Sequence, residues 1–352
     1  MERSEEKKMA MGQGTSRRKF LQRISLGVAA IGACGPGLVI PRVARAQQPA
    51  RQLTKVRLTC GANLGFTPLY VGEATDIFRK HGIDGTIILF DVGFQGTEAV
   101  IAGHADTATT VEFPLFNLLL KGADLIIPAI YITADDHKIV ALNSIQKPED
   151  LIGKRVGYIF GSSAHYAFDR YLAKFGIPRD KVKAINVPAA EQVALMAKGD
   201  IDAYIWVEPV VSRGLEVMAG KAHVVSPGIE AAYKTRNYLE LLRPWAEKNP
   251  DVVVNLLRAL IECNEFIKNE PKRTAEICAR KLNLPAEHVP EMLRKIGCNW
   301  DVYLDAAVIQ VFSEVAAWLK EQGRLSGNPP DIRRVLAPEY LRKIDPARVR
   351  GF

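Results

Sequence analysis

The chain has 352 residues, of which 48% are hydrophobic and 24% charged, and its formal net charge is +8. Residues 1–46 hold nine Lys or Arg and three Asp or Glu, so six of the eight positive charges lie there and the rest of the chain carries only about +2. This near balance argues against a surface that binds nucleic acid or acidic membranes. The 306 residues that follow exceed what one hydrophobic core usually holds, so we expect two lobes.

Paired arginines stand in the N-terminal segment. Arg17 and Arg18 precede a mildly apolar run over residues 20–40, which contains polar side chains, several glycines and a proline. That composition makes the run a poor membrane span. Paired arginines before such a run are typical of a twin-arginine export signal.

The same segment ends in an Ala-x-Ala cleavage pattern at Ala44 and Ala46. We therefore expect residues 1–46 to be a twin-arginine export signal that is removed, and the mature protein to be periplasmic and to begin near Gln47. The alternative is a lipoprotein signal in which Cys34 is the lipidated residue.

Short apolar strands alternate with helical patterns from residue 55 to about residue 225. The letters VRLTC at 56–60 and TIILF at 86–90 predict strands, and the segment 68–83 between them has the apolar spacing of a helix. Such alternation is typical of an α/β domain with a largely parallel sheet.

A strand-to-helix turn is predicted within residues 156–175. The letters VGYIF indicate a strand that runs into Gly161, and the helix after it has an apolar face. Ser162 and Ser163 therefore stand where the first backbone N–H groups of a helix lack partners. In the simplest interpretation one of these serines caps the helix. The alternative is an anion site, because unpaired N–H groups and the helix dipole favour a bound negative group.

Two short segments of the chain resemble each other. GHADTATTVEFP from Gly103 aligns without gaps with GDIDAYIWVEPV from Gly199, at an offset of 96. The matching pairs are Gly103/Gly199, Asp106/Asp202, Val111/Val207 and Glu112/Glu208. Each segment is predicted to be a turn, a strand and a polar strand end, and ligands of open α/β sheets bind at such ends. We therefore expect two lobes whose equivalent strand ends face one cleft.

Long helices replace the alternating pattern beyond residue 238. Apolar residues recur at helical spacing over residues 251–269, 273–282 and 305–323, with little strand signal. The expected fold class is α/β, with two lobes and a helical C-terminal part.

The sequence contains none of the common catalytic or metal-binding motifs. It has no G-x-S-x-G elbow, no H-E-x-x-H and no phosphate-binding glycine loop after the first strand, and Ser162 and Ser163 have no identifiable base. The histidines lack zinc spacing and no cysteine pair has C-x-x-C spacing. We expect no metal, no cofactor and no enzyme activity. The cysteines after the signal, expected as free thiols with a Cys263–Cys278 pair left open, are Cys60, Cys263, Cys278 and Cys298.

Several stretches resemble the substrate-binding proteins of the aliphatic sulfonate, taurine and nitrate importers. The most specific are GSSAHYAFDRYLAKFGI from Gly161 and VPAAEQVALMAKGDIDAYIWVEP from Val187; GFTPLYVGEATDIFRKHGID, KPEDLIGKRVGY and APEYLRKID add to them. The resemblance covers nearly all of the mature chain. It implies the type II periplasmic-binding-protein fold, in which two α/β lobes joined by crossover strands close on a ligand and deliver it to an ATP-driven permease.

The resemblance also implies lobe boundaries. Lobe 1 would begin with residues 47–137, lobe 2 would take residues 138–228, and residues 229–352 would return to lobe 1 and add the C-terminal helices.

The resemblance further implies which residues bind the ligand. From lobe 1 these are Gly65, Phe66, Gln95, Gly96, Thr109 and Thr110, and from lobe 2 they are Ser162, Ser163, His165 and Trp206. The serines and His165 match the anion-holding helix start of the family, and the Trp206 indole can pack on the apolar part of a ligand. Gln95 departs from a glycine pair that the family often has. Core positions for Phe66 and Trp206, and a packing role for His165, remain open.

Two glutamates complete the predicted site, although a carboxylate would repel a sulfonate. Glu112 and Glu208 are expected either to meet the ammonium group of an amino-sulfonate or to cap a following helix. The letters TADDHKIVAL are expected to carry the first crossover. Asp135, Asp136 and His137 would then lie near the hinge.

The leading expectation is a monomeric periplasmic receptor of an ABC importer for a small organic anion, with an aliphatic sulfonate or taurine as the first candidates and no nucleic acid as partner. Nitrate, an aromatic carboxylate and a thiamine-pyrimidine precursor are the alternative ligands. The remote alternative is an enzyme like the pyrimidine synthases of the same superfamily, which are cytosolic and have a cysteine-rich stretch. This chain has an export pattern and scattered cysteines instead.

Overall fold

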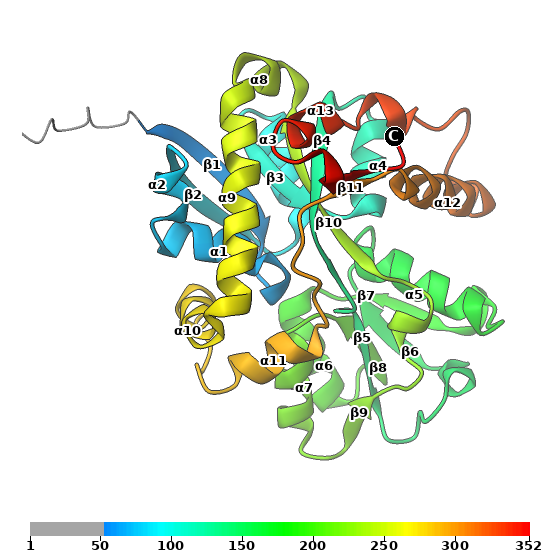
Figure 1. The fold of residues 1–352 in the computed structure, drawn as a ribbon. Coiled ribbons are helices and arrows are strands. Elements are labelled where there is room, and N and C mark those ends of the chain that lie inside the picture. The colour runs from blue at the N-terminus through cyan, green and yellow to red at the C-terminus, as the bar shows by residue number, and fades with distance from the viewer. Residues whose placement is uncertain (1–52) are drawn as a thin grey trace, which may run out of the picture. The chain divides into compact units, whose positions relative to one another are not determined.

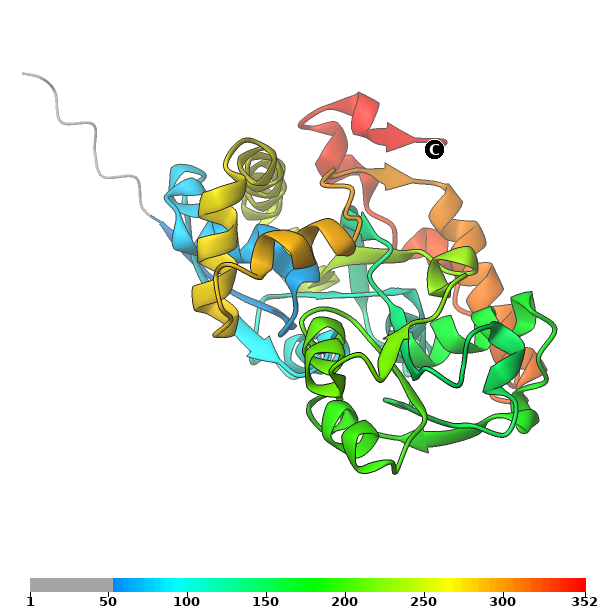
Figure 2. The same cartoon turned by 90° about the horizontal axis from the view of Figure 1, so that it is seen from below.

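The computed structural model describes residues 53–352, so the predicted export signal lies outside the described residues. The described residues form two five-stranded sheets that are covered by helices (Figure 1). In Figures 1 and 2 the strands of residues 138–224, drawn in teal to green, form a group separate from the blue and cyan strands.

The first sheet has the strand order β2-β1-β3-β10-β4. Its strands are β1 (Thr54–Gly61), β2 (Ile83–Phe90), β3 (Thr107–Thr110), β4 (Leu125–Ala134) and β10 (Thr235–Leu242). β1 pairs in parallel with β2 and β3, and β10 runs antiparallel between β3 and β4. All ten residues of β4 are buried, which agrees with its continuous apolar sequence, LIIPAIYITA.

The second sheet has the strand order β7-β6-β8-β5-β9. Its strands are β5 (Lys138–Leu142), β6 (Arg155–Tyr158), β7 (Lys183–Asn186), β8 (Ala203–Trp206) and β9 (Ala222–Val224). β6 pairs in parallel with β7 and β8, and β5 runs antiparallel between β8 and β9. Each sheet thus has three parallel strands in the order second-first-third, followed by one antiparallel strand that arrives from the other part of the chain.

The predicted internal similarity corresponds to equivalent positions in the two sheets. Asp106 precedes β3 and accepts hydrogen bonds from the backbone N–H of Arg57 at 2.8 Å and from its guanidinium at 2.9 and 3.1 Å. Asp202 precedes β8 and accepts the same three bonds from Arg155, at 2.8, 2.7 and 3.1 Å. The same carboxylate therefore fixes the same turn in both sheets.

Helices make up the rest of the described fold. They are α1 (Thr67–Ala74), α2 (Ile77–Lys80), α3 (Gly93–Ile101), α4 (Glu112–Leu120), α5 (Ser163–Lys174), α6 (Ala189–Lys198), α7 (Val210–Met218), α8 (Arg243–Lys248), α9 (Pro250–Asn269), α10 (Pro271–Leu282), α11 (Val289–Lys295), α12 (Ala307–Glu321) and α13 (Pro338–Arg342). Two short strands, β11 (Leu304–Asp305) and β12 (Val349–Arg350), pair near the C-terminus.

The single helix predicted over residues 68–83 is wrong. The structure divides this segment into α1 and α2, and residue 83 already begins β2. Thr75 has an extended backbone, and its hydroxyl turns back to the carbonyl of Val71 at 2.7 Å. A threonine hydroxyl that bonds the backbone locally competes with the helix, which explains the break.

Two crossover segments connect the sheets. Residues 135–137 lead from β4 to β5, and residues 225–234 lead from β9 back to β10. The long helix α9 then packs on α1, and α12 packs on α4 (Figure 1). α9 buries residues at helical spacing, which are Val253, Val254, Leu256, Leu257, Ala259, Leu260, Cys263, Asn264 and Ile267.

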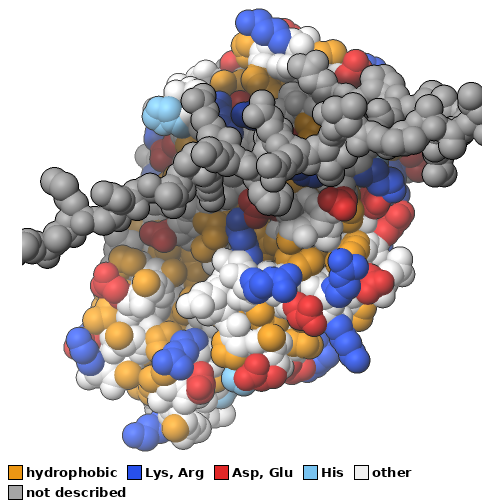
Figure 3. All heavy atoms as spheres, turned by 90° about the vertical axis from the view of Figure 1, so that its left-hand side faces the viewer, with side chains coloured by type: hydrophobic (Ala, Val, Ile, Leu, Met, Phe, Trp, Pro, Cys, Tyr) orange, Lys and Arg blue, Asp and Glu red, His pale blue; other side chains and the backbone are white. Residues whose placement is uncertain are grey.

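The surface of the described residues carries both charges. On the face in Figure 3, the visible Lys or Arg and Asp or Glu side chains are interspersed, in agreement with the nearly balanced charge that follows residue 46. Among the described residues no helix is both long and apolar enough to cross a membrane.

Candidate functional site

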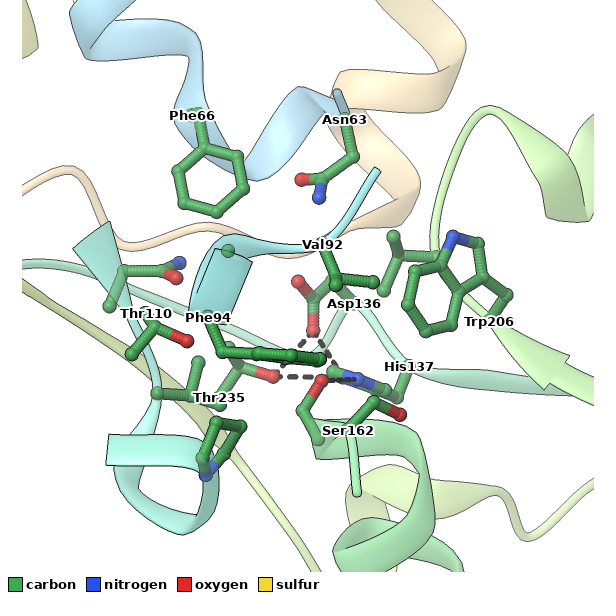
Figure 4. A pocket seen from close by; sticks show the side chains of 16 residues that line it. Asn63, Phe66, Val92, Phe94, Thr110, Asp136, His137, Ser162, Trp206 and Thr235 are labelled. Carbon is green, nitrogen blue, oxygen red and sulfur yellow. Dashed lines mark hydrogen bonds and ion pairs between the residues drawn. The ribbon is translucent and has the colours of Figure 1, made fainter. Parts of the chain in front are cut away.

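A cleft lies where strand ends of the two sheets meet, and its cavity volume is about 50 Å³. Side chains of both sheets, of adjoining helices and of the first crossover segment line it (Figure 4). The polar ones are Asn63, Thr110, Asp136, His137, Ser162, Ser163, Thr235 and Asn237, and the larger apolar ones are Phe66, Val92, Phe94 and Trp206.

Equivalent strand ends contribute to the cleft from each sheet. Thr110 is the last residue of β3 and Trp206 the last of β8, and both line the cleft together with Val111 and Val207 that follow them. Carboxyl ends of parallel strands are where open α/β sheets bind ligands. The prediction that the two similar segments face one cleft is therefore confirmed.

Helix α5 begins at this cleft without a side-chain cap. Ser162 occupies the N-cap position, but its hydroxyl donates to the carbonyl of Ile159 at 2.7 Å instead of accepting from the helix. The prediction that one of the two serines caps α5 is wrong, because Ser163 also directs its hydroxyl elsewhere, to His137. The backbone N–H groups of Ser163, Ala164 and His165 donate to no group among the described residues. These three N–H groups are therefore unpaired hydrogen-bond donors at the positive end of a helix dipole.

Three polar side chains in the cleft have free hydrogen-bonding groups. Within the described residues, the Thr110 hydroxyl and the Asn237 amide make no side-chain hydrogen bond, and Asn63 uses only its amide oxygen, which accepts from the N–H of Gly65 at 2.9 Å. The Asn63 and Asn237 amide groups can each donate two hydrogen bonds. An oxyanion at the start of α5 could therefore also meet side-chain donors from the first sheet.

A chain of hydrogen bonds crosses from the first crossover segment to α5. His137 Nε2 lies 2.9 Å from Ser163 Oγ, and His137 Nδ1 lies 2.8 Å from Asp136 Oδ1 (Figure 4). The hydroxyl of Thr235, at the start of β10, donates to the same Asp136 oxygen at 2.5 Å. The expectation that the serines lack an identifiable base is therefore wrong, because His137 contacts Ser163. The two residues are far apart in the sequence, so no motif connects them.

The Asp136 carboxyl is ionised in this arrangement. Burial, the largest influence, would raise its pKa, but the neighbouring His137 and the hydrogen bonds from His137 and Thr235 outweigh it and leave the pKa below its ordinary value. Asp136 and His137 are 5% and 4% exposed. The two residues expected only near the hinge thus lie in the wall of the cleft.

The NMT1/THI5-like family model matches residues 63–274, which is more than half of the chain. The chain belongs to the NMT1/THI5-like family. The matched residues include both five-stranded sheets except β1, and the whole of the cleft wall.

Two relatives from Escherichia coli are similar over most of their length. The taurine-binding periplasmic protein of Escherichia coli is 24% identical over 313 residues, which covers 83% of this chain and 95% of the relative. A putative aliphatic sulfonates-binding protein of the same organism is 26% identical over 300 residues, covering 81% and 90%.

Solved structures with similar folds include sulfonate-binding proteins. The aliphatic sulphonate binding protein SsuA of Escherichia coli superposes with a TM-score of 0.70 at 21% identity, covering 80% of this chain and 96% of SsuA. The SsuA of Xanthomonas axonopodis pv. citri, bound to MOPS, gives 0.69 at 22% identity, covering 87% and 100%. The predicted type II periplasmic-binding-protein fold is confirmed.

Some of the predicted site residues of this NMT1/THI5-like chain line the cleft, and the others do not. Those that line the cleft are Phe66, Thr110, Ser162, Ser163 and Trp206. Gly65 lies beside it, because a Cβ built there would be 3.6 Å from Asp136 Oδ2. Ligand binding by these residues stays a prediction.

Three predicted residues, two on α3 and one on β3, support the cleft wall but do not line it. Gln95 uses its side-chain oxygen to accept from the N–H of Val92 at 3.3 Å. Gly96 lets α3 approach β1, since a Cβ there would lie 2.3 Å from the Thr59 hydroxyl. Thr109 donates to the carbonyl of Thr59 at 3.2 Å.

Neither predicted glutamate lines the cleft. Glu208 accepts from the N–H and hydroxyl of Ser212 at 3.0 and 2.8 Å, so it caps α7, which confirms the capping alternative. Glu112 is completely buried, and neither of its carboxyl oxygens has a hydrogen-bond partner among the described residues. Burial raises the pKa of Glu112 although the charge of Arg236 opposes the shift.

His165 packs beneath the cleft instead of lining it. Its Nδ1 accepts from the N–H of Gly161 at 3.2 Å, and its ring contacts Phe113, Phe160 and Trp318. Burial, reinforced by nearby arginines, lowers the pKa of His165 to about 4. His165 is therefore neutral near pH 7 and adds no positive charge for an anion.

Four cleft residues were missed by sequence reasoning. Asn63, Phe94, Thr235 and Asn237 line the cleft but belong to no motif in the sequence. Asn63 stands just after β1, where an argument from strand ends could have found it. Within residues 53–352 no group of histidine, cysteine or carboxylate side chains could hold a metal ion.

Proposed function

We propose that this chain is the periplasmic substrate-binding receptor of an ABC importer and that it binds a small organic anion in the cleft, with aliphatic sulfonates and taurine as the first candidates. The observation that carries the proposal is the uncapped start of α5, whose three unpaired N–H groups lie beside Ser162 and Ser163 at the cleft. Oxyanions bind at such helix starts.

The other walls of the cleft suit an organic anion. Phe66, Phe94 and Trp206 offer apolar surface for a carbon chain, and Thr110 and Asn237 offer donors from the opposite sheet. A ligand held by both sheets would favour their approach, since only contacts that differ between two states shift an equilibrium. The E. coli relatives named for taurine and aliphatic sulfonates support a sulfonate over nitrate.

The carboxylate that could meet the ammonium group of taurine is Asp136, since Glu112 and Glu208 do not line the cleft. Its Oδ1 is engaged by His137 and Thr235, which leaves Oδ2 for a ligand. The lobes are residues 47–137 with the return of the chain at 229–352, and residues 138–228. Export proceeds through the twin-arginine signal of residues 1–46.

A charge placed at the start of α5 tests the site. In Ser162→Asp a carboxylate at the N-cap satisfies the helix N–H groups and its dipole, so the fold should be retained. The same charge repels a bound anion, so calorimetric titration with taurine and alkanesulfonates should show affinity reduced at least about tenfold. Ser144→Asp, which adds the same charge in an exposed turn of the same sheet, is the control and should bind normally. A folded Ser162→Asp variant that binds at wild-type affinity would place the anion elsewhere.

A second candidate function is acyl transfer, which the Ser163–His137–Asp136 arrangement favours. Ser163 Oγ would attack an acyl carbon, His137 Nε2 would accept the proton and return it to the leaving alcohol, and Asp136 would orient the imidazole. A fluorophosphonate probe should then label Ser163, as intact-mass and peptide analysis would show. The absence of an adduct after prolonged incubation would remove this candidate.

A further inference from the structure

His137 controls which way the hydroxyl of Ser163 can point. Asp136 Oδ1 accepts from the Thr235 hydroxyl and lies 2.8 Å from His137 Nδ1, and a carboxylate can only accept, so the proton between Asp136 and His137 sits on Nδ1. If His137 is neutral, Nε2 carries no proton and must accept the hydrogen bond from Ser163, 2.9 Å away. A serine has one O–H group, so Ser163 then presents only lone pairs to the cleft.

Protonation of His137 reverses this hydrogen bond. Nε2 then carries a proton and donates to Ser163 Oγ, which frees the serine O–H to donate into the cleft. Ser163 is the first residue of α5, beside the unpaired N–H groups. An oxyanion at that point would otherwise face the lone pairs of Ser163, and a positive charge on the ring would also attract it.

The surroundings of His137 tolerate the added proton. Asp136 is the adjacent negative charge, Glu112 of α4 also interacts electrostatically with the ring, and the Tyr233 ring packs edge-on against it at 5.7 Å. Thr235 contributes a neutral hydroxyl at 3.0 Å from Nδ1. No arginine or lysine side chain lines the cleft among the described residues, so the site has no permanent side-chain cation for an anion.

We infer that the cleft binds an oxyanion together with one proton, which His137 takes up. This inference rests on the proposed function. Of the six histidines in the chain, His137 is the one that lines the cleft. Histidine is also the side chain that ordinarily changes charge between pH 5 and pH 8. His137 is accordingly a positioning residue, which makes Ser163 a donor only when the ring is charged.

Titration calorimetry with ethanesulfonate between pH 5 and pH 8.5 tests the inference, because ethanesulfonate itself does not change charge in that range. We expect the affinity to fall as the pH rises, approaching tenfold per pH unit at the alkaline end. Measurements at pH 8 in buffers of different ionisation enthalpy should show uptake of about one proton. A constant affinity with no proton uptake would overturn the inference while leaving the proposed function intact; no binding of any sulfonate at any pH would overturn the proposed function.

A variant separates His137 from other titrating groups. His137→Gln places a non-titrating amide that can always donate to Ser163, so it should bind ethanesulfonate with a flat pH profile and no proton uptake. His104→Gln removes an exposed histidine and should keep the wild-type profile. If His137→Gln does not fold, the wild-type protein still provides the test by NMR. Ethanesulfonate should raise the pH at which the His137 ring Cε1–H signal titrates, and an unmoved midpoint contradicts the inference.

Discussion

Two histidines lie near the start of α5, and their surroundings assign them different states. His137 reaches Ser163 from the crossover segment and is held by an ionised carboxylate. His165 is on α5 itself, but Phe113, Trp318 and the neighbouring arginines surround it and lower its pKa to about 4. The family resemblance, which implies His165 as a site residue because it follows GSS at the helix start, pointed to the wrong one of the two histidines.

His165 should make the fold acid-sensitive. Its folded pKa of about 4 lies below the ordinary value, so between those two values the unfolded chain binds a proton that the folded chain refuses. Stability is therefore fully present above about pH 6.5 and is lost as the pH falls towards 4, by roughly 3 kcal/mol for a shift of this size. Asp169, 3.7 Å from the ring, does not prevent this because it is already paired with Arg179.

Urea unfolding of the wild-type protein and of His165→Asn, at pH 7 and pH 4.5, measures this effect. Asparagine keeps an acceptor near the N–H of Gly161 but does not titrate, so the variant should lose less stability on acidification than the wild type. His104→Asn, at an exposed position, should lose as much as the wild type. Equal acid losses in His165→Asn and the wild type would show that the histidine is protonated in the folded state at little cost.

At the scale of secondary-structure elements, the periodic segments were predictable and the crossovers were not. In strands such as β2 and helices such as α9 and α12, apolar residues recur at strand or helix spacing in the sequence. These elements form because one apolar face packs against the core. The similarity between residues 103–114 and 199–210 was also predictive, because Asp106 and Asp202 make the same contacts with Arg57 and Arg155.

The candidate site was predictable where it sits on strand ends. The resemblance implies Thr110 and Trp206, and both lie at strand ends, where such folds bind ligands. Asp136, His137, Thr235 and Asn237 were not assigned to the cleft, since they lie in or directly after crossover segments that have no period of their own. Their position depends on the pairing of β4 with β10, which are about 100 residues apart in the sequence, and on the pairing of β5 in the second sheet.

At the scale of the whole molecule, four cysteine thiols report how the described fold opens. Cys60, Cys263, Cys278 and Cys298 are free thiols in the structure. Burial raises the pKa of Cys60 to about 12 and that of Cys278 to about 11, and it raises the pKa of the other two as well. The reactive species is the thiolate, so these thiols should react only after the chain opens.

Thiol labelling of the mature chain should therefore measure global opening and its linkage to the ligand. With Ellman's reagent at pH 8, the buried thiols should react slowly in the folded protein and at once in denaturant, where four thiols should be counted. A ligand at one hundred times its dissociation constant adds about 2.7 kcal/mol to the stability, so labelling should slow about a hundredfold if opening requires release of the ligand.

Cys60 lies next to the last residue of β1, close to the cleft, whereas Cys263 lies on α9. The labelling rates of these two thiols therefore distinguish local from global opening. Ligand protection of Cys60 alone would indicate that the first sheet opens independently, and rapid labelling of all four thiols in the folded protein would contradict the packing of this core.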